Sequence, residues 1–111
     1  MKIKIYSCGG TFEKIYDPLT GQLIFKNSCL AELIDRSRVT QETTTETILL
    51  KDSLDMTDKD RELILSKINL DPLKQIILIH GTDTMIKTAK FLMSKIDPSK
   101  TIVITGAMVP Y

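Results

Sequence analysis

The chain has 111 residues, of which 42% are hydrophobic and 26% are charged, and its formal net charge is +1. This length suffices for one domain, residues 1–111, around a single apolar core, and the near balance of charges gives no electrostatic reason to expect nucleic acid. No apolar run approaches the roughly 20 residues that a membrane-spanning helix needs, so we expect no membrane partner.

Cysteine and histidine are sparse. Cys8 and Cys29 lie far apart and lack the C-x-x-C spacing of a metal or redox pair. Secreted domains that depend on disulfides usually carry more cysteines, so this usage predicts a reducing cytoplasm. With His80 as the single histidine and no Cys/His cluster, the sequence predicts no metal site. The opening stretch MKIKIYS is too short and too alternating for a secretory signal.

The first elements are a strand and a turn-rich segment. Residues 2–8, KIKIYSC, are rich in β-formers and predict a strand that ends at a Gly-Gly pair. Residues 11–25 contain the turn signal DPLTG and predict a loop or a β-hairpin. Apolar residues at helical spacing then predict a short helix over 30–38, preceded by the candidate caps Asn27 and Ser28.

A second strand and helix follow. Residues 43–50, TTTETILL, predict a strand because β-branched residues dominate them. Thr57 is the expected cap of a helix that runs to the helix-breaking DPL at 71–73. The charged residues of 58–62, DKDRE, predict a solvated face of that helix.

The last third repeats the alternation. Residues 75–80, QIILIH, are apolar up to the terminal histidine and predict a strand that is covered on both faces. Apolar side chains at helical spacing predict a helix over 85–96, with Met85 and Met93 in the core. Residues 101–105, TIVIT, predict a fourth strand.

The alternation of strands and helices predicts the fold class. It implies right-handed crossovers and an α/β fold with a mainly parallel, Rossmann-like sheet in three layers. In such a sheet, ligands bind beyond the carboxyl ends of the strands. The segments that leave these ends are GGT, KDS, GTDT and GAM, so the pattern predicts a polar site for a small polar ligand at one edge.

Each candidate residue at this edge also has a structural interpretation. Thr11 follows two glycines, and its hydroxyl is either a nucleophile or a group that bonds its own turn. Thr82 and Asp83 either belong to a site or cap the next helix. Ser53 either binds a carboxylate or shapes its loop, and His80 is more simply a core or edge histidine than a general base.

Four motifs, in order, resemble those of the bacterial-type L-asparaginase family. SCGGTFEK is similar to the T-G-G-T-[IF] segment of that family, and KDSLDMT to its D-S-x-x-[MN]-T loop. HGTDTM is similar to its second signature, and VITGAMVPY to a strand exit that commonly reads G-A-M-x-P. The set covers the chain almost end to end, and it is more similar to a shorter, one-domain branch than to the typical two-domain relatives.

The resemblance implies an N-terminal asparaginase-type domain and a reaction without a cofactor. The family hydrolyses the side-chain amide of L-asparagine, and often of L-glutamine, to the acid and ammonia. By position, Thr11 resembles the attacking hydroxyl, and Thr82 and Asp83 resemble the second threonine and its acidic neighbour. Asp83 would also contact the amino group of the substrate, and Ser53 would hold its α-carboxylate.

The resemblance implies three further site residues. Gly10 and Gly81 complete the expected substrate-binding set, and Tyr16 is the only nearby candidate for the tyrosine with which the family activates its nucleophile. Relatives build their sites at dimer contacts, so a homo-oligomer is expected.

The sequence also departs from the family pattern. Cys8 stands where the first threonine of T-G-G-T is expected, and Leu54 stands where many relatives carry glutamine. The lysine that partners the second threonine in the family would lie beyond Tyr111, so the chain is expected to be truncated. The alternative function is a non-catalytic module for amino-acid binding or assembly.

Overall fold

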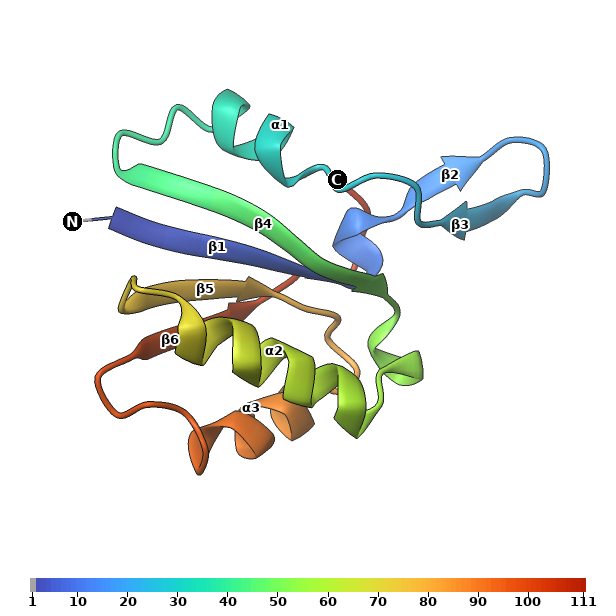
Figure 1. Ribbon diagram of the computed structural model, residues 1–111. Coiled ribbons are helices and arrows are strands. Elements are labelled where there is room, and N and C mark those ends of the chain that lie inside the picture. The colour runs from blue at the N-terminus through green and yellow to red at the C-terminus, as the bar shows by residue number, and fades with distance from the viewer. Residues whose placement is uncertain (1) are drawn as a thin grey trace.

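The computed structural model describes residues 2–111 and has an α/β fold (Figure 1). Its main sheet is parallel and has the strand order β4-β1-β5-β6. The strands are β1 (Lys2–Gly9), β4 (Glu42–Lys51), β5 (Gln75–Ile79) and β6 (Thr101–Thr105). The predicted fold class is therefore confirmed, together with each of its four strands.

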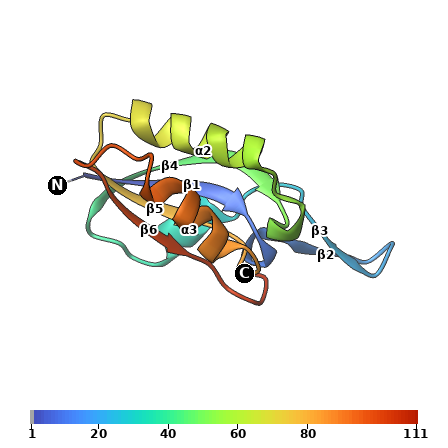
Figure 2. The ribbon, with the colours of Figure 1, turned by 90° about the horizontal axis from the view of Figure 1, so that it is seen from below.

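Helices cover both faces of this sheet (Figures 1 and 2). They are α1 (Leu30–Arg36) on one face, and α2 (Asp58–Leu70) and α3 (Met85–Met93) on the other. No helix formed by residues 2–111 has the length and apolar character that crossing a membrane requires.

The core is divided between the two faces because successive side chains of a strand point to opposite sides. The larger apolar cluster lies under α2 and α3 and includes Ile64, Ile68 and Leu78. The smaller cluster lies under α1 and includes Leu30 and Ile79. The strand β5 contributes to both, as expected for a strand that is covered on both faces.

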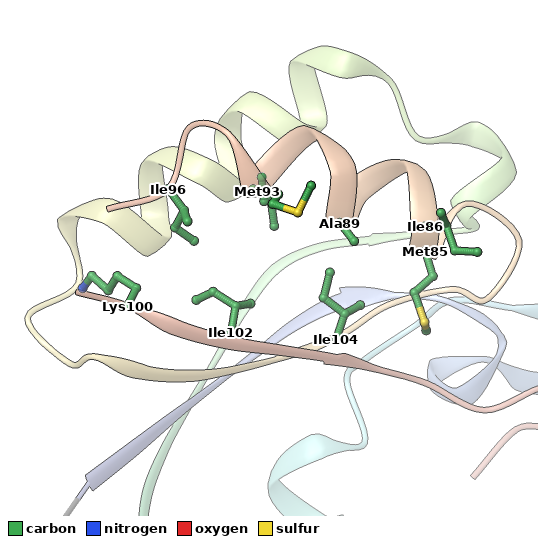
Figure 3. Close-up of a pocket in the computed structure, with 9 residues that line it drawn as sticks. Met85, Ile86, Ala89, Met93, Ile96, Lys100, Ile102 and Ile104 are labelled. Carbon is green, nitrogen blue, oxygen red and sulfur yellow. The ribbon is translucent and has the colours of Figure 1, made fainter. Parts of the chain in front are cut away.

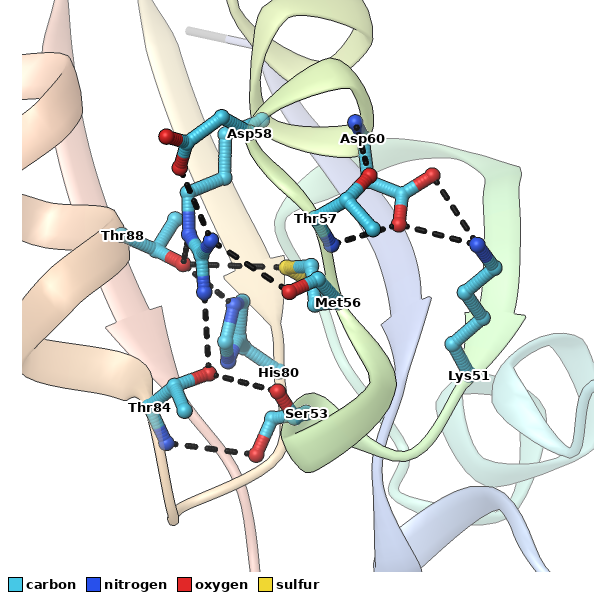
Figure 4. A network of polar contacts seen from close by, with 10 residues as sticks. Lys51, Ser53, Met56, Thr57, Asp58, Asp60, His80, Thr84 and Thr88 are labelled. Atoms are coloured by element: carbon cyan, nitrogen blue, oxygen red, sulfur yellow. Dashed lines mark hydrogen bonds and ion pairs between the residues drawn. The ribbon is translucent and has the colours of Figure 1, made fainter.

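Thr57 caps α2 as predicted (Figure 4). Its hydroxyl accepts a hydrogen bond from Asp60 N at 3.2 Å, and the Asp60 carboxylate accepts one from Thr57 N at 2.9 Å. This reciprocal pair satisfies two backbone donors of the first turn. Lys51, the last residue of β4, also pairs with Asp60 at 2.9 Å, so the same carboxylate ties the strand to the helix.

Residues 11–25 form a β-hairpin, one of the two structures predicted for them. Their elements are the 3-10 turn η1 (Thr11–Glu13) and the antiparallel strands β2 (Ile15–Asp17) and β3 (Gln22–Ile24). In the DPLTG turn, the Asp17 carboxylate accepts from Leu19 N at 3.1 Å and from the Thr20 hydroxyl at 2.8 Å. The hairpin projects beyond the carboxyl edge of the main sheet (Figure 1).

The helix ends and one cap differ from the sequence expectations. α1 ends at Arg36, and the chain turns away at Arg38, which has a left-handed φ of 54°. α3 ends at Met93 rather than at residue 96. Cys29, and not Asn27 or Ser28, is the first half-helical residue of α1, and no side chain caps that helix in the usual way.

The expectation that Met85 and Met93 lie in the core is wrong. Met93 is 77% exposed, and both methionines line an open apolar groove of about 510 Å³ between α3 and β6 (Figure 3). Ile102 and Ile104 of β6 form its floor. Within residues 2–111, β6 is an edge strand that pairs with β5 alone, so no described element covers this side of α3.

Candidate active site

The segments that leave the strands of the main sheet meet at one edge, and there their backbones touch. A Cβ atom on Gly10, after β1, would stand 2.6 Å from Cα of Gly81, after β5. A Cβ atom on Gly81 would stand 2.7 Å from Oγ of Ser53, after β4. A Cβ atom on Gly106, after β6, would collide with the carbonyl oxygen of His80. Glycine therefore lets four strand exits converge at this edge.

The exit from β1 also needs glycine for its backbone angles. Gly9 and Gly10 have φ values of +92° and +86°, which side chains rarely tolerate. Gly10 N donates to the carbonyl oxygen of Lys51 at 2.9 Å, which fastens the turn to the end of β4. Thr11 follows at once and opens η1, so its position is set by this turn.

Three candidate side chains have no structural task in residues 2–111. Thr11 is half-buried, Thr82 and Asp83 are exposed, and none of the three forms a side-chain hydrogen bond or ion pair with a described residue. Neither Thr82 nor Asp83 caps α3, whose N-cap is Thr84 without a side-chain cap bond. The Thr11 hydroxyl likewise makes no hydrogen bond within its own turn. The three polar groups are thus available to a ligand.

Ser53 has the structural role that the sequence allowed as one of two interpretations. The residue is buried in the one-turn helix η2 (Ser53–Asp55) and shapes the loop, because its Oγ accepts from Thr84 N at 3.2 Å. Its carbonyl oxygen accepts from the Thr84 hydroxyl at 2.9 Å. The hydroxyl hydrogen of Ser53 is donated to no described residue, so it remains free for an acceptor such as a carboxylate.

Besides the bond from Gly10 to Lys51, an ion pair connects the end of η1 to the start of η2. Lys14, directly after η1, pairs with Asp52 at 2.7 Å, and both side chains are largely shielded. Asp52 also accepts from Leu54 N at 3.0 Å and so caps η2. The hydrogen bond from Lys14, followed by the bond from Leu54 N, lowers the pKa of Asp52, which keeps that carboxyl ionised beside the site.

Tyr16 stands apart from this convergence. It lies on the hairpin strand β2 opposite Leu23, its side chain is 63% exposed, and it hydrogen-bonds no described side chain. The structure therefore brings together the strand exits that carry Gly10, Gly81 and Ser53, and it leaves Tyr16 on a projecting arm.

A buried polar network lies behind the 81–84 segment (Figure 4). Its centre is Arg61 of α2, which is 1% exposed. Arg61 donates to the hydroxyl of Thr88 at 3.0 Å and to the hydroxyl of Thr84 at 3.2 Å, and it pairs with Asp58 at 3.2 Å. The predicted solvated face over 58–62 is therefore wrong at Arg61.

The sequence contained a signal for this burial. Arg61 precedes Ile64 by three residues and Ile68 by seven, so it lies on the apolar stripe of α2, and all three residues are buried. A charged residue at the head of an apolar stripe is a candidate for a buried, hydrogen-bonded position.

His80 belongs to the same network, and its burial and the nearby Arg61 favour the neutral imidazole. Its Nδ1 lies 2.7 Å from the carbonyl oxygen of Gly81, which can only accept, so Nδ1 carries the proton. Its Nε2 then accepts from the Thr88 hydroxyl at 2.8 Å. Burial lowers the pKa of His80, the bond to Gly81 opposes this, and the charge of Arg61 lowers it further. His80 is thus a satisfied core histidine.

On the other face of the sheet, Glu13 forms a second buried cluster that sequence reasoning missed. Its carboxylate accepts from Ser28 Oγ at 2.5 Å, from Cys29 N and Cys29 Sγ at 2.8 Å each, and from Ser7 Oγ. Burial alone would raise the pKa of Glu13, but the hydrogen bonds from Cys29, Ser28 and Ser7 together lower it. The cluster ties η1 to β1 and to the start of α1.

Nothing in the residue pattern marks Glu13. It lies in a single 3-10 turn, where no helical or strand periodicity separates a buried position from an exposed one. For metals, the described residues contain no group of three or more His, Cys, Asp or Glu side chains that could hold an ion.

The chain is similar to known proteins over its whole length. Residues 2–111 match the family described as "Asparaginase, N-terminal". The L-asparaginase 1 of Escherichia coli strain K12 is 32% identical, with 92% of this chain and 32% of that protein covered. A probable L-asparaginase 1 of Schizosaccharomyces pombe is 39% identical, with 44% of this chain and 14% of that protein covered.

Solved structures of similar proteins share the fold. L-asparaginase I from Vibrio cholerae has a TM-score of 0.82 and 27% identity, covering 98% of this chain and 34% of its own. The probable cytoplasmic L-asparaginase from Campylobacter jejuni has a TM-score of 0.82 and 27% identity, and the match covers 98% of this chain and 35% of that one. The thermostable L-asparaginase from Thermococcus kodakarensis has a TM-score of 0.80 and 26% identity, and the match covers 99% of this chain and 35% of that one. The chain spans about a third of the length of these solved chains.

Proposed function

Because the chain belongs to the asparaginase family, whose N-terminal domain it matches, we propose that its strand exits form an amidohydrolase site for a free amino acid. The substrate in this proposal is L-asparagine, with L-glutamine as a second substrate, and the products are the acid and ammonia. One observation carries the proposal: Gly10, Gly81 and Ser53 are in direct contact, and Thr11, Thr82 and Asp83 beside them have unengaged side chains.

In the proposed reaction, Thr11 is the nucleophile. Its hydroxyl oxygen attacks the side-chain amide carbon, the amide nitrogen takes up a proton and leaves as ammonia, and an acyl ester on Thr11 remains. Water, assisted by Thr82 and Asp83, then hydrolyses this ester and restores the Thr11 hydroxyl. The tetrahedral intermediates need hydrogen-bond donors for their oxyanion; Gly10 N already donates to Lys51, so the backbone N–H of Thr11 is the donor that this turn offers.

The head group of the amino acid would be bound by two complementary groups. The free hydroxyl hydrogen of Ser53 suits the α-carboxylate, and the unpaired Asp83 carboxylate suits the α-ammonium group. A site with one donor and one carboxylate in this arrangement selects a zwitterion. In this proposal Tyr16 assists Thr11 from the hairpin.

A second candidate function is amino-acid binding without turnover. The observation in its favour is that Asp83 forms no ion pair with any described lysine, and that Lys87, the next lysine along the chain, is exposed on α3. A site of this kind would bind the head group and leave the amide intact.

Ammonia release and calorimetric binding, measured in parallel on the chain, separate the two functions. We expect ammonia from L-asparagine, and we expect Thr11→Ala to reduce its rate by about a thousand-fold or more, since nucleophile removal costs other hydrolases at least this much. Thr40→Ala, at an exposed threonine outside the site, is the matched control and should retain the full rate.

The other outcomes are equally informative. Binding of L-asparagine without ammonia supports the non-catalytic function and contradicts turnover. Absence of both binding and ammonia, in a chain that folds, overturns both functions.

The proposal extends to location and assembly. A cytoplasmic location is supported by the Campylobacter relative, which is described as a probable cytoplasmic L-asparaginase, and by the sparse cysteines. We further propose a homo-oligomer, which sedimentation velocity would test directly: a species of one chain at micromolar concentration would contradict it.

A further inference from the structure

Arg61 is a buried charge that neither the fold nor the proposed chemistry requires. Its side chain is 1% exposed, and its one carboxylate partner among the described residues, Asp58, is 70% exposed. Removing a guanidinium from water is costly, and a solvated carboxylate returns little of that free energy. An apolar side chain at this point of the α2 stripe would avoid this cost, so the hydrogen bonds of the arginine are what distinguish it there.

The donors of Arg61 join the segment before α2 to the start of α3. Nη1 lies 3.5 Å from the carbonyl oxygen of Met56, Nε donates to Thr88 of α3 at 3.0 Å, and Nη2 donates to Thr84 at 3.2 Å. A guanidinium presents these donors in one rigid plane, so it fixes direction as well as distance.

Thr84 transmits this constraint to the site. Its hydroxyl accepts from Arg61 and donates to the carbonyl oxygen of Ser53, while its N–H donates to Ser53 Oγ. Ser53 is therefore held at two atoms by one residue, which Arg61 holds in turn. Because Ser53 Oγ already accepts a hydrogen bond, its own hydrogen remains to be donated. Thr82 and Asp83 immediately precede Thr84 and share its placement.

We propose that Arg61 is a positioning residue for amino-acid binding: its buried guanidinium fixes Thr84, and through Thr84 it fixes Ser53 and the Thr82–Asp83 segment. Arg61 does not touch the ligand in this proposal. The inference rests on the proposed function for its ligand, whereas the placement of the 81–84 segment can be measured without any ligand.

Two pairs of variants test the chain of contacts. Arg61→Met keeps an unbranched side chain and removes every donor, whereas Arg61→Lys keeps the charge and removes the planar fork. Thr84→Val keeps the shape and removes both side-chain hydrogen bonds, whereas Thr84→Ser restores the hydroxyl. Arg36→Met, at an exposed arginine of α1, is the matched control.

The readouts are amide hydrogen exchange measured by NMR and the Kd for L-aspartate measured by calorimetry. L-aspartate is the acid product of the proposed reaction and has the same α-amino and α-carboxylate groups as L-asparagine. We expect Arg61→Met and Thr84→Val to speed exchange at the Thr84 amide about tenfold more than at the β5 amides, because local opening of the 81–84 segment adds to any loss of global stability. The Kd should rise by about tenfold, which corresponds to the loss of one good hydrogen bond. Arg61→Lys should behave as Arg61→Met, and Thr84→Ser and Arg36→Met as the original chain.

Unchanged exchange at Thr84 in both variants would overturn the inference. Equal acceleration in β5 and at Thr84 would also overturn it, because it would mean that Arg61 supports global stability alone. If Arg61→Met does not fold, the Thr84→Val and Thr84→Ser pair decides. If the original chain neither binds L-asparagine nor releases ammonia, the proposed function fails, and the exchange data still decide whether Arg61 positions the segment.

Discussion

Two buried charges of opposite sign lie behind the candidate site, on opposite faces of the same sheet. Glu13 is on the side covered by α1, and Arg61 is on the side covered by α2 and α3. Each is 1% exposed, and each fixes one segment of the site. Glu13 ends the turn η1 that begins with Thr11, whereas Arg61 holds Thr84 at the end of the 81–84 segment.

The two clusters differ in how their charge is satisfied. All donors to Glu13 are neutral and lie within residues 7–29, so its cluster is local in the sequence. The partners of Arg61 extend from residue 56 to residue 88 and come together only when α2 and α3 have docked on the sheet. The cluster that holds the end of η1 is thus local in the sequence, whereas the cluster that holds Thr84 forms only in the tertiary structure.

The largest expected effect breaks the local cluster. Glu13→Ala leaves the donors of Ser7, Ser28 and Cys29 without their acceptor, so we expect the free energy of unfolding to fall by about 3 kcal/mol or more. Urea denaturation measures this loss. Glu32→Ala, at an exposed glutamate of α1, is the control and should change the free energy by less than about 0.5 kcal/mol. A loss below about 1 kcal/mol for Glu13→Ala would contradict a structural role.

A smaller effect is expected on the other face. Thr88→Val keeps the side-chain shape and removes the oxygen that accepts from Arg61 and donates to His80, so two buried nitrogens lose one partner each. We expect a loss of about 1–3 kcal/mol by the same denaturation experiment, because Arg61 retains its other acceptors. The double variant with Glu13→Ala tests whether the two clusters are independent. Its loss of unfolding free energy should equal the sum of the two single losses within about 0.5 kcal/mol, because the clusters share no partner.

The smallest effect is the response to acid, in which the loss of stability begins at a different pH for each cluster. Each pKa is lowered by folding, so the unfolded chain binds protons more readily and falling pH favours unfolding. Stability that depends on neutral His80 is complete above its usual pKa of 6.5 and is lost as the pH falls through that value. Stability that depends on ionised Glu13 is complete above its usual pKa of 4.5 and is lost below it.

Unfolding free energies measured from pH 8 to pH 3 should therefore begin to fall below about pH 6.5, the upper step, and fall more steeply below about pH 4.5, the lower step. His80→Asn should remove the upper step and leave the lower one. Glu13→Gln should reduce the lower step without abolishing it, because Asp52, Asp60 and Asp71 also have lowered pKa values. A single step below pH 4.5 in the original chain would contradict the neutral state of His80.

The framework of the fold follows from local sequence signals. The β-branched run at 43–50 and the apolar run at 75–79 form β4 and β5, and Thr57 caps α2 where the sequence predicts it. The parallel order then places every strand exit on one edge, so the neighbourhood of Gly10, Gly81 and Ser53 was predictable from alternation alone.

The supporting residues behind the site were harder to predict, for a physical reason. Whether a charged side chain is buried depends on partners that tertiary structure supplies, and Arg61 finds its acceptors on Thr84 and Thr88, more than twenty residues away. The prediction for Met93 was wrong in the opposite sense. Met93 belongs to a series of apolar residues at helical spacing, but nothing in residues 2–111 covers that side of α3. The spacing of apolar residues shows which face of a helix is apolar, but it does not show whether another element packs against that face.

The central place of β1 bears on how the chain acquires its structure. Lys4 pairs with Thr44 on one side and with Ile76 on the other, so β1 gains its second neighbour only after the chain has been synthesised as far as β5. Such long sequence separations slow folding towards the millisecond-to-second range. Until β5 has been synthesised, one edge of the KIKIY segment stays open to other extended chains, and nascent molecules are most prone to aggregate in that interval.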